Sequence, residues 1–251
     1  MTEQVRMMSF EGKSGVKAQI LEQLKAHRAA DEIIQGVYWE LGKGCAVGCT
    51  IHSRKHKDFE KQFNLPEWLA RLEDVIFEGL PNDKAKDFPV ELWAAIPEQK
   101  DLQSVKWRYG AFILQENVDR VLTLQINDEF KKQVVNSIKQ ALQVFEAAIR
   151  IGTWDNSAAD SASCSAAFAA YYAEDLPVGV SAAFCAVRSA ASATGSTPYS
   201  ISRATIYSAR VSAAVFAGVS FSAPIAYEGY AANAYEGYAA KLIQLLKETG
   251  K

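Results

Sequence analysis

Cysteine is scarce in this chain, with four among 251 residues. Domains held together by disulfides use cysteine far more densely, so we expect free thiols in a reducing compartment. The sequence also lacks an excess of one charge, because its formal net charge at pH 7 is only −2. Duplex nucleic acid is bound through concentrated basic surface, so the charge balance predicts no nucleic-acid partner of this kind.

Long apolar runs are absent as well. The longest uncharged helical candidate, residues 211–227, contains serines, a glycine and a proline. It falls short of the roughly 20 apolar residues that a membrane span needs. The first residues lack the basic start, apolar stretch and cleavage site of a signal peptide. We therefore expect a cytoplasmic protein with no membrane partner.

Amphipathic helices are indicated up to about residue 150 by apolar residues that recur at helical spacing. Ser14 is expected to cap a helix that Gly36 ends. Pro66 fits the first turn of a helix that ends near Gly79. No alternating pattern indicates paired strands, so this half is predicted to be all-α. Three further helical runs are expected at 88–96, 102–117 and 128–150.

Beyond Gly152 the composition changes to alanine and serine, repeated in groups of four. Residues four apart lie on one helix face, and small side chains there let helices approach closely. A flexible linker would lack the large apolar and aromatic residues that interrupt these repeats. We therefore predict an all-α fold in which residues 1–150 form amphipathic helices and residues 151–251 an Ala/Ser-rich helical bundle, together one compact unit.

Two sequence strings and the tail carry a resemblance to a known family. Residues 42–53 read GKGCAVGCTIHS and residues 69–82 read LARLEDVIFEGLPN. With the Ala/Ser-rich tail, they resemble a family of uncharacterised bacteriophage and prophage proteins. The tail departs from the family at Asp160, Cys164 and Phe168, where relatives often carry tryptophan. The resemblance implies a phage accessory protein that acts on host defence or metabolism, and it implies no particular activity.

Metal-ligating residue types gather at Cys45, Cys49, His52 and His56. On one continuous helix all four would share a face, but Cys45 and His56 would lie roughly 16 Å apart, too far for one ion. A neighbouring pair could share an ion with ligands from elsewhere; alternatively, the cysteines face the core and the histidines lie at its polar boundary. The candidate metal ligands are His27, Asp31, Cys49, His52, His56, Glu73, Asp74 and Glu78.

Two charged groups in the first half have competing interpretations. Lys43 lies between two glycines, where backbone N–H groups and a lysine can bind an anion, although the Walker pattern is absent. Glu73, Asp74 and Glu78 have the spacing to collect a divalent ion on one helix. Such carboxylates are more often a solvated face or a set of buried ion pairs.

Charged residues are rare between positions 157 and 223. A charge in such a bundle is unfavourable unless it is paired or serves a ligand. Arg203 and Arg210 share a helix face with Tyr207 between them, a combination that suits a nucleotide-like or carboxylated ligand. The alternatives are pairing with the few acidic residues or exposure to solvent. The predicted ligand-binding residues are Arg188, Arg203, Tyr207, Arg210 and Lys43.

Four tyrosines, Tyr227, Tyr230, Tyr235 and Tyr238, fall on one side of the last predicted helix. Such a stripe is typical of core packing or of contact in a homo-oligomer.

Three functions are compatible with these patterns. The leading hypothesis is a non-enzymatic protein without a cofactor that binds a small anionic, nucleotide-like ligand and sequesters a host defence signal. The first alternative is a metal-dependent hydrolase in which histidines and carboxylates hold a divalent ion that activates water. The second is an inhibitor that binds a host protein through an exposed face.

Overall fold

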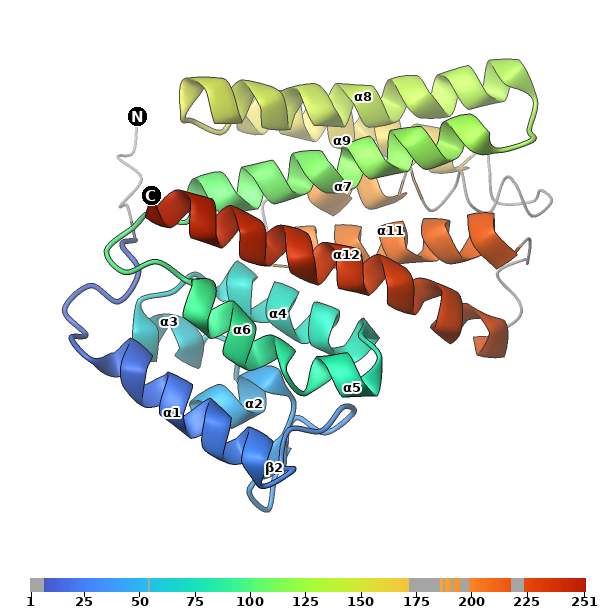
Figure 1. The fold of residues 1–251 in the computed structure, drawn as a ribbon. Coiled ribbons are helices and arrows are strands. Elements are labelled where there is room, and N and C mark those ends of the chain that lie inside the picture. The colour runs from blue at the N-terminus through green and yellow to red at the C-terminus, as the bar shows by residue number, and fades with distance from the viewer. Residues whose placement is uncertain are drawn as a thin grey trace. The chain divides into compact units, whose positions relative to one another are not determined.

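The computed structural model describes residues 7–53, 55–171, 186, 188–190, 192–194, 199–217 and 224–251. The fold is all-α, as predicted, and its described part has one antiparallel pair of two-residue strands (Figure 1). The described elements are α1 (Val16–Ala29), β1 (Trp39–Glu40), β2 (Lys43–Gly44), α2 (Ala46–Ile51), α3 (Asp58–Phe63), α4 (Glu67–Gly79), α5 (Asn82–Ala85), α6 (Phe88–Ala95), α7 (Gln103–Thr123), α8 (Asp128–Ile151), α9 (Asn156–Tyr171), α11 (Ser200–Ala217) and α12 (Pro224–Gly250).

The chain forms two compact units. Met1–Val105 and Glu236–Lys251 make up the first, and Lys106–Tyr235 makes up the second. The helices α7 and α12 therefore each continue from one unit into the other. The change in composition near residue 150 falls inside the second unit, between α8 and α9.

The short helix α2 is the centre of the first unit. α1, α3, α4, α6 and β2 all pack against it, and all six of its residues are buried. Glycine makes this burial possible, because a Cβ at Gly48 would lie 1.7 Å from the carbonyl oxygen of Tyr38. A Cβ at Gly44 would lie 2.3 Å from the same oxygen. The chain before β1 thus lies directly against α2.

Both ends of α2 are satisfied by specific hydrogen bonds. At its N-terminus the Cys45 sulfur accepts from the Gly48 N–H at 3.4 Å. At its C-terminus the Gln23 side-chain amide donates to the carbonyls of Cys49 and Thr50, at 2.6 and 3.0 Å. His52 then adopts a left-handed conformation, with φ of 47°, and ends the helix.

The first helix is shorter than the sequence predicts. Gly15, one residue after Ser14, takes the N-cap position, and α1 ends at Ala29 instead of continuing to Gly36. The reason is a tertiary pairing that competes with the helix. Ile33 forms a parallel bridge with Gly44 and is only 1% exposed, so residues beyond α1 gain more from pairing with β2 than from another helical turn.

An aromatic cluster fills the first unit on the side of α3 and α6. The rings of Phe10, Phe59 and Phe63 lie with their centroids 5.0 to 5.9 Å from that of Trp93, in tilted and edge-to-face arrangements that aromatic pairs favour. The predicted helix after Pro66 is confirmed as α4, which ends at Gly79. The predicted run 88–96 is confirmed as α6.

The second unit is built on α7 and α8, which confirm the predicted runs 102–117 and 128–150. The two helices lie side by side (Figure 1) and approach closely at Gly110, where a Cβ would lie 2.3 Å from the Phe145 ring. α9 packs on α8 and buries Ala159, Ala162 and Ala166. Small residues at helical spacing thus do line a helix face, as the sequence predicts.

Polar side chains link α11 to α7 inside the second unit. The Ser208 hydroxyl donates to the Asn117 side-chain oxygen at 2.8 Å and accepts from Arg120 at 3.2 Å. The Thr205 hydroxyl reaches the Tyr109 hydroxyl at 3.5 Å. These contacts supply partners for hydroxyl groups that the Ser-rich sequence places in a buried position.

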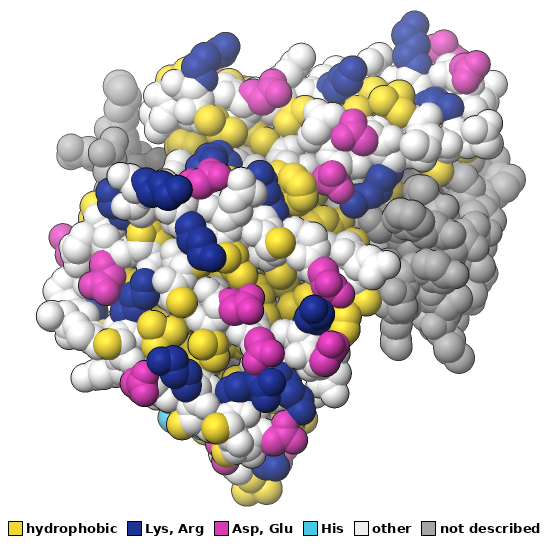
Figure 2. Space-filling model, viewed as in Figure 1, with side chains coloured by type: hydrophobic (Ala, Val, Ile, Leu, Met, Phe, Trp, Pro, Cys, Tyr) yellow, Lys and Arg dark blue, Asp and Glu magenta, His cyan; other side chains and the backbone are white. Residues whose placement is uncertain are grey.

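Two observations concern helix hydropathy and the distribution of surface charge. None of the described helices combines the length and the apolar content that crossing a membrane requires. On the face shown in Figure 2, acidic and basic side chains are interspersed rather than separated by sign.

The close approach at Gly48 predicts a strong effect of a single methyl group. Gly48→Ala should destabilise the protein by about 3 kcal/mol, because the methyl group must displace backbone and not a flexible side chain. Gly237→Ala is the matched control, since nothing lies within 4 Å of its Cβ position on α12 and alanine favours a helix. Thermal unfolding should show a lower midpoint for Gly48→Ala and an unchanged or higher one for Gly237→Ala. Equal midpoints would contradict this account of α2.

Candidate functional site

Two of the predicted metal ligands meet as a histidine pair in the first unit. His27, in the last turn of α1, places its Nε2 3.0 Å from Nε2 of His52. Its other ring nitrogen, Nδ1, lies 2.7 Å from a Glu32 carboxylate oxygen. The His52 ring stacks on Trp39, with centroids 4.4 Å apart and planes 15° apart. With Nδ1 of His27 donating to Glu32, its Nε2 accepts from His52.

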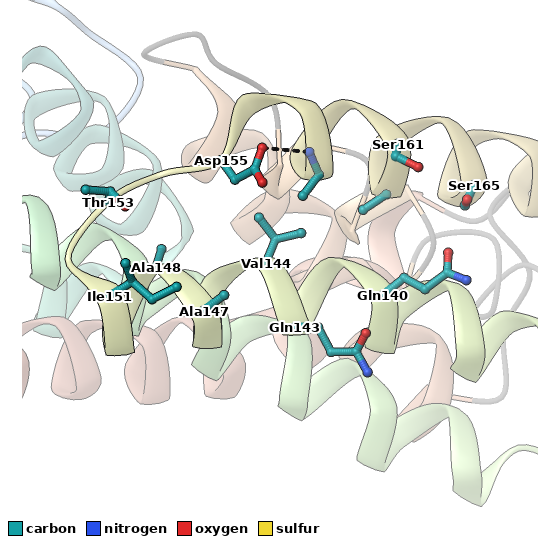
Figure 3. A pocket seen from close by; sticks show the side chains of 12 residues that line it. Gln140, Gln143, Val144, Ala147, Ala148, Ile151, Thr153, Asp155, Ser161 and Ser165 are labelled. Atoms are coloured by element: carbon teal, nitrogen blue, oxygen red, sulfur yellow. Dashed lines mark hydrogen bonds between the residues drawn. The ribbon is translucent and has the colours of Figure 1, made fainter. Parts of the chain in front are cut away.

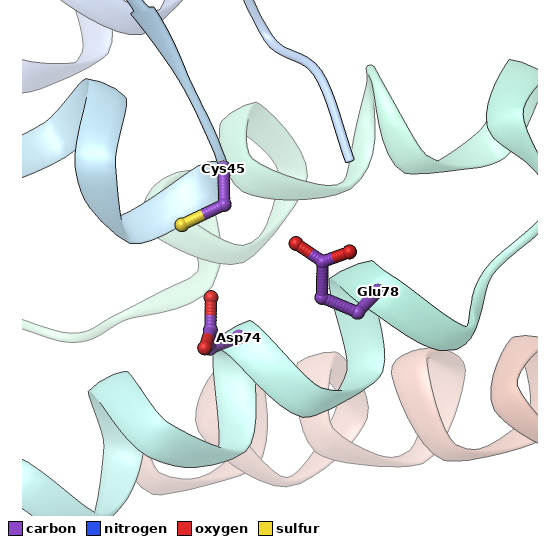
Figure 4. A group of neighbouring side chains, drawn as sticks. All are labelled: Cys45, Asp74 and Glu78. Carbon is purple, nitrogen blue, oxygen red and sulfur yellow. The ribbon is translucent and has the colours of Figure 1, made fainter. Parts of the chain in front are cut away.

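A second group lies between α2 and α4. Nε2 of His56 is 3.4 Å from a carboxylate oxygen of Asp74, and the Tyr38 hydroxyl contacts the same imidazole. Asp74, Glu78 and the Cys45 thiol each offer a ligand atom, and these atoms all lie within 4.8 Å of one another. Figure 4 shows both carboxyl groups projecting from α4 toward the cysteine.

The electrostatic environment of this group disfavours additional negative charge. Burial, with the charges of Asp74 and Glu78, raises the pKa of the Cys45 thiol well above its usual range. Burial also raises the pKa of Glu78. The hydrogen bond from the Gly36 N–H partly offsets this rise in pKa, and the charge of Asp74 adds to it. The thiol is therefore protonated at neutral pH, which argues against a reactive thiolate at this position.

Three other predicted ligands do not belong to this cluster of ligand atoms. Asp31 is exposed and pairs with Lys86. Cys49 donates to the Gly44 carbonyl at 3.3 Å, and burial raises its pKa to about 12, as expected for a cysteine that faces the core. Glu73 is fully buried, so burial, followed by the charge of Asp74, raises its pKa well above its usual range despite the nearby Trp93 indole.

In the second unit two arginines converge on one tyrosine. The guanidinium carbons of Arg188 and Arg210 lie 5.6 and 5.7 Å from the centroid of the Tyr207 ring. Arg188 also donates to the Tyr207 hydroxyl at 3.5 Å. Arg203 is exposed. Its backbone N–H donates to the Tyr199 carbonyl, but its side chain makes no hydrogen bond, ion pair or ring contact with the residues that the structure describes. The spacing of residues along α11 could not show that Arg188 contacts Tyr207, because Arg188 lies on another segment of the chain.

Lys43 belongs to the first unit, where it is exposed on β2. The first turn of α2 follows it, but that turn is buried and its Gly48 N–H is already bonded to the Cys45 sulfur. The geometry at Lys43 therefore offers an anion little more than the lysine itself.

A pocket of about 520 Å³ lies between α8 and α9. Small and apolar side chains line it together with glutamine side chains of α8 and serine side chains of α9 (Figure 3). The sequence analysis did not predict this pocket. The alanine repeat of α9 was a signal for it, because short side chains leave space beside a helix. Its lining residues are Gln140, Gln143, Val144, Ala147, Ala148, Ile151, Thr153, Asp155, Ala158, Ser161, Ala162 and Ser165.

Comparisons with protein families, with curated proteins and with solved structures found no match to this chain.

The histidine pair predicts a loss of stability in acid. Desolvation of the imidazole, followed by the charge of the neighbouring His27, lowers the pKa of His52 below its usual range. The unfolded chain therefore takes up a proton at a higher pH than the folded chain, so the contribution to stability is present above about pH 6.5 and is lost as the pH falls through the folded-state pKa.

His52→Asn tests this, because asparagine tolerates the left-handed conformation without titrating. Chemical unfolding at pH 7.5 and pH 5.5 should show a smaller acid loss for the variant than for the wild type. Identical losses would show that protonation of His52 is not coupled to folding.

Proposed function

We propose that this protein binds a small anionic ligand at Tyr207, using the guanidinium groups of Arg188 and Arg210. The observation that carries the proposal is the convergence of two cations on one aromatic ring, from chain segments separated in sequence. An anion that contacts both guanidinium groups would be attracted by each of them. Each guanidinium can also donate two parallel hydrogen bonds to a carboxylate or phosphate.

The two guanidinium groups at Tyr207 suit an anionic ligand. Among the described residues, the buried neighbours on α11, such as Ala204, Thr205 and Ser208, carry no charge. Tyr207 and Arg210 are half-buried and Arg188 is exposed, so a ligand could reach the group from solvent. Partial burial strengthens electrostatic attraction, because the local dielectric is lower than in water.

The proposed role is sequestration. Guanidinium groups beside an aromatic ring suit a nucleotide-like anion. The expected role as a phage accessory protein would make this anion a host defence signal, which the protein would withdraw from its receptor without altering it.

Thermal unfolding at low ionic strength with pyrophosphate, ATP, cyclic AMP and citrate is the test. We expect at least one of these anions to raise the unfolding midpoint of the wild type. Arg188→Ala and Arg210→Ala should each weaken binding about tenfold or more, the loss typical of a charge-assisted hydrogen bond. Arg203→Ala is the matched control from the same helix and should bind like the wild type. Mass spectrometry should recover the ligand unchanged.

Two outcomes would overturn the proposal. One is the absence of stabilisation by any anion in the panel. The other is equal weakening by Arg203→Ala and Arg210→Ala, which would show that binding follows overall charge and not the group at Tyr207.

A further inference from the structure

A thiol and two carboxyl groups face one another between α2 and α4. Cys45 is the N-cap of α2, while Asp74 and Glu78 lie one turn apart on α4. The three ligand atoms are within 4.8 Å of one another. Because α2 and α4 pack together, their position depends on the core of the first unit and not on a loop.

The hydrogen bonds around the group leave one acceptor unused. Asp74 Oδ2 lies 3.4 Å from His56 Nε2. Its Oδ1 is buried and has no partner at hydrogen-bond geometry among the described residues, although the Cys45 thiol, whose pKa is raised by burial, also interacts with the Asp74 carboxylate, which raises the pKa of the thiol further. Glu78 accepts from the Gly36 N–H at 2.8 Å. Cys45 is 1% exposed. A buried oxygen without a donor is unfavourable, and a cation would satisfy it.

We propose that Cys45, Asp74 and Glu78 bind one divalent transition-metal ion of the Zn²⁺ class. His56 and Gly36 would hold the two carboxylates in place, as hydrogen-bond partners of metal ligands commonly do. The sequence analysis named Cys49 as a candidate metal ligand, whereas the proposed site uses Cys45. This site is independent of the arginine group at Tyr207.

The donor set selects the class of metal. A thiolate with carboxylates suits Zn²⁺ and its neighbours, whereas Mg²⁺ and Ca²⁺ take oxygen ligands. Zn²⁺ bond lengths place tetrahedral ligand atoms roughly 3.3 to 3.8 Å apart. The three ligand atoms lie within 4.8 Å of one another, so binding requires a contraction of at most about 1.5 Å. Three protein ligands leave a fourth position for water.

Metal binding changes the protonation of the site in a defined way. The S–H bond of Cys45 breaks, its proton passes to solvent and the sulfur forms the bond to the metal. The charge of the ion then opposes the negative charges of Asp74 and Glu78 that act on this thiol in the metal-free protein.

Titration of the full-length, chelator-stripped protein with Co²⁺ tests the proposal, because cobalt bound to a thiolate gives a charge-transfer band in the near ultraviolet. We expect one Co²⁺ per chain, displacement by Zn²⁺ and no displacement by Mg²⁺ or Ca²⁺. The band should vanish in Cys45→Ala and persist in Cys49→Ala, the matched control, because Cys49 is equally buried and lies one helical turn away. Glu78→Gln should weaken Co²⁺ binding at least tenfold.

Folding of each variant is checked by circular dichroism. If Cys45→Ala does not fold, the exposed Glu78→Gln and the isosteric Asp74→Asn decide the question, since unchanged Co²⁺ affinity in both overturns the proposal. It is also overturned if Co²⁺ gives no thiolate band in the wild type, or if the band is lost in Cys49→Ala but kept in Cys45→Ala.

Discussion

The contact of the Tyr38 carbonyl with Gly44 and Gly48 is the constraint on which the first unit depends. It brings the chain before β1 against α2 and leaves room for no side chain between them. α2 can therefore be buried on all sides, although it is only six residues long. An isolated helix of this length is unstable in water, so its stability comes from the elements packed around it. Two of those elements, α1 and α4, carry His27, Asp74 and Glu78, and their packing on α2 fixes where these side chains lie.

In the second unit, small residues allow the helices to pack closely. Ala159, Ala162 and Ala166 allow α9 to lie on α8, and Gly110 allows the Phe145 ring to lie against α7. Small side chains bury little apolar area each, so close contact over a long interface has to compensate. Serine and threonine remain compatible with this core because their hydroxyls reach carbonyls or side chains on adjacent turns and helices.

Both candidate sites gather polar and charged side chains that the fold brings together. In the first unit two carboxyl groups and a protonated thiol converge, a group that a dication would stabilise. In the second unit two guanidinium groups converge on Tyr207, a group that an anion would stabilise. We interpret both groups as candidate sites because each brings together side chains from segments that are far apart in sequence.

The sequence by itself determined the all-α class, the helix that begins after Pro66 and the small-residue face of α9, because these depend on spacing within one segment. Only the tertiary structure decided that α1 ends at Ala29, where pairing of Ile33 with Gly44 outweighs another helical turn. The same holds for both groups of charges: periodicity orients a side chain about its own helix axis, but it carries no information about which other segment lies opposite.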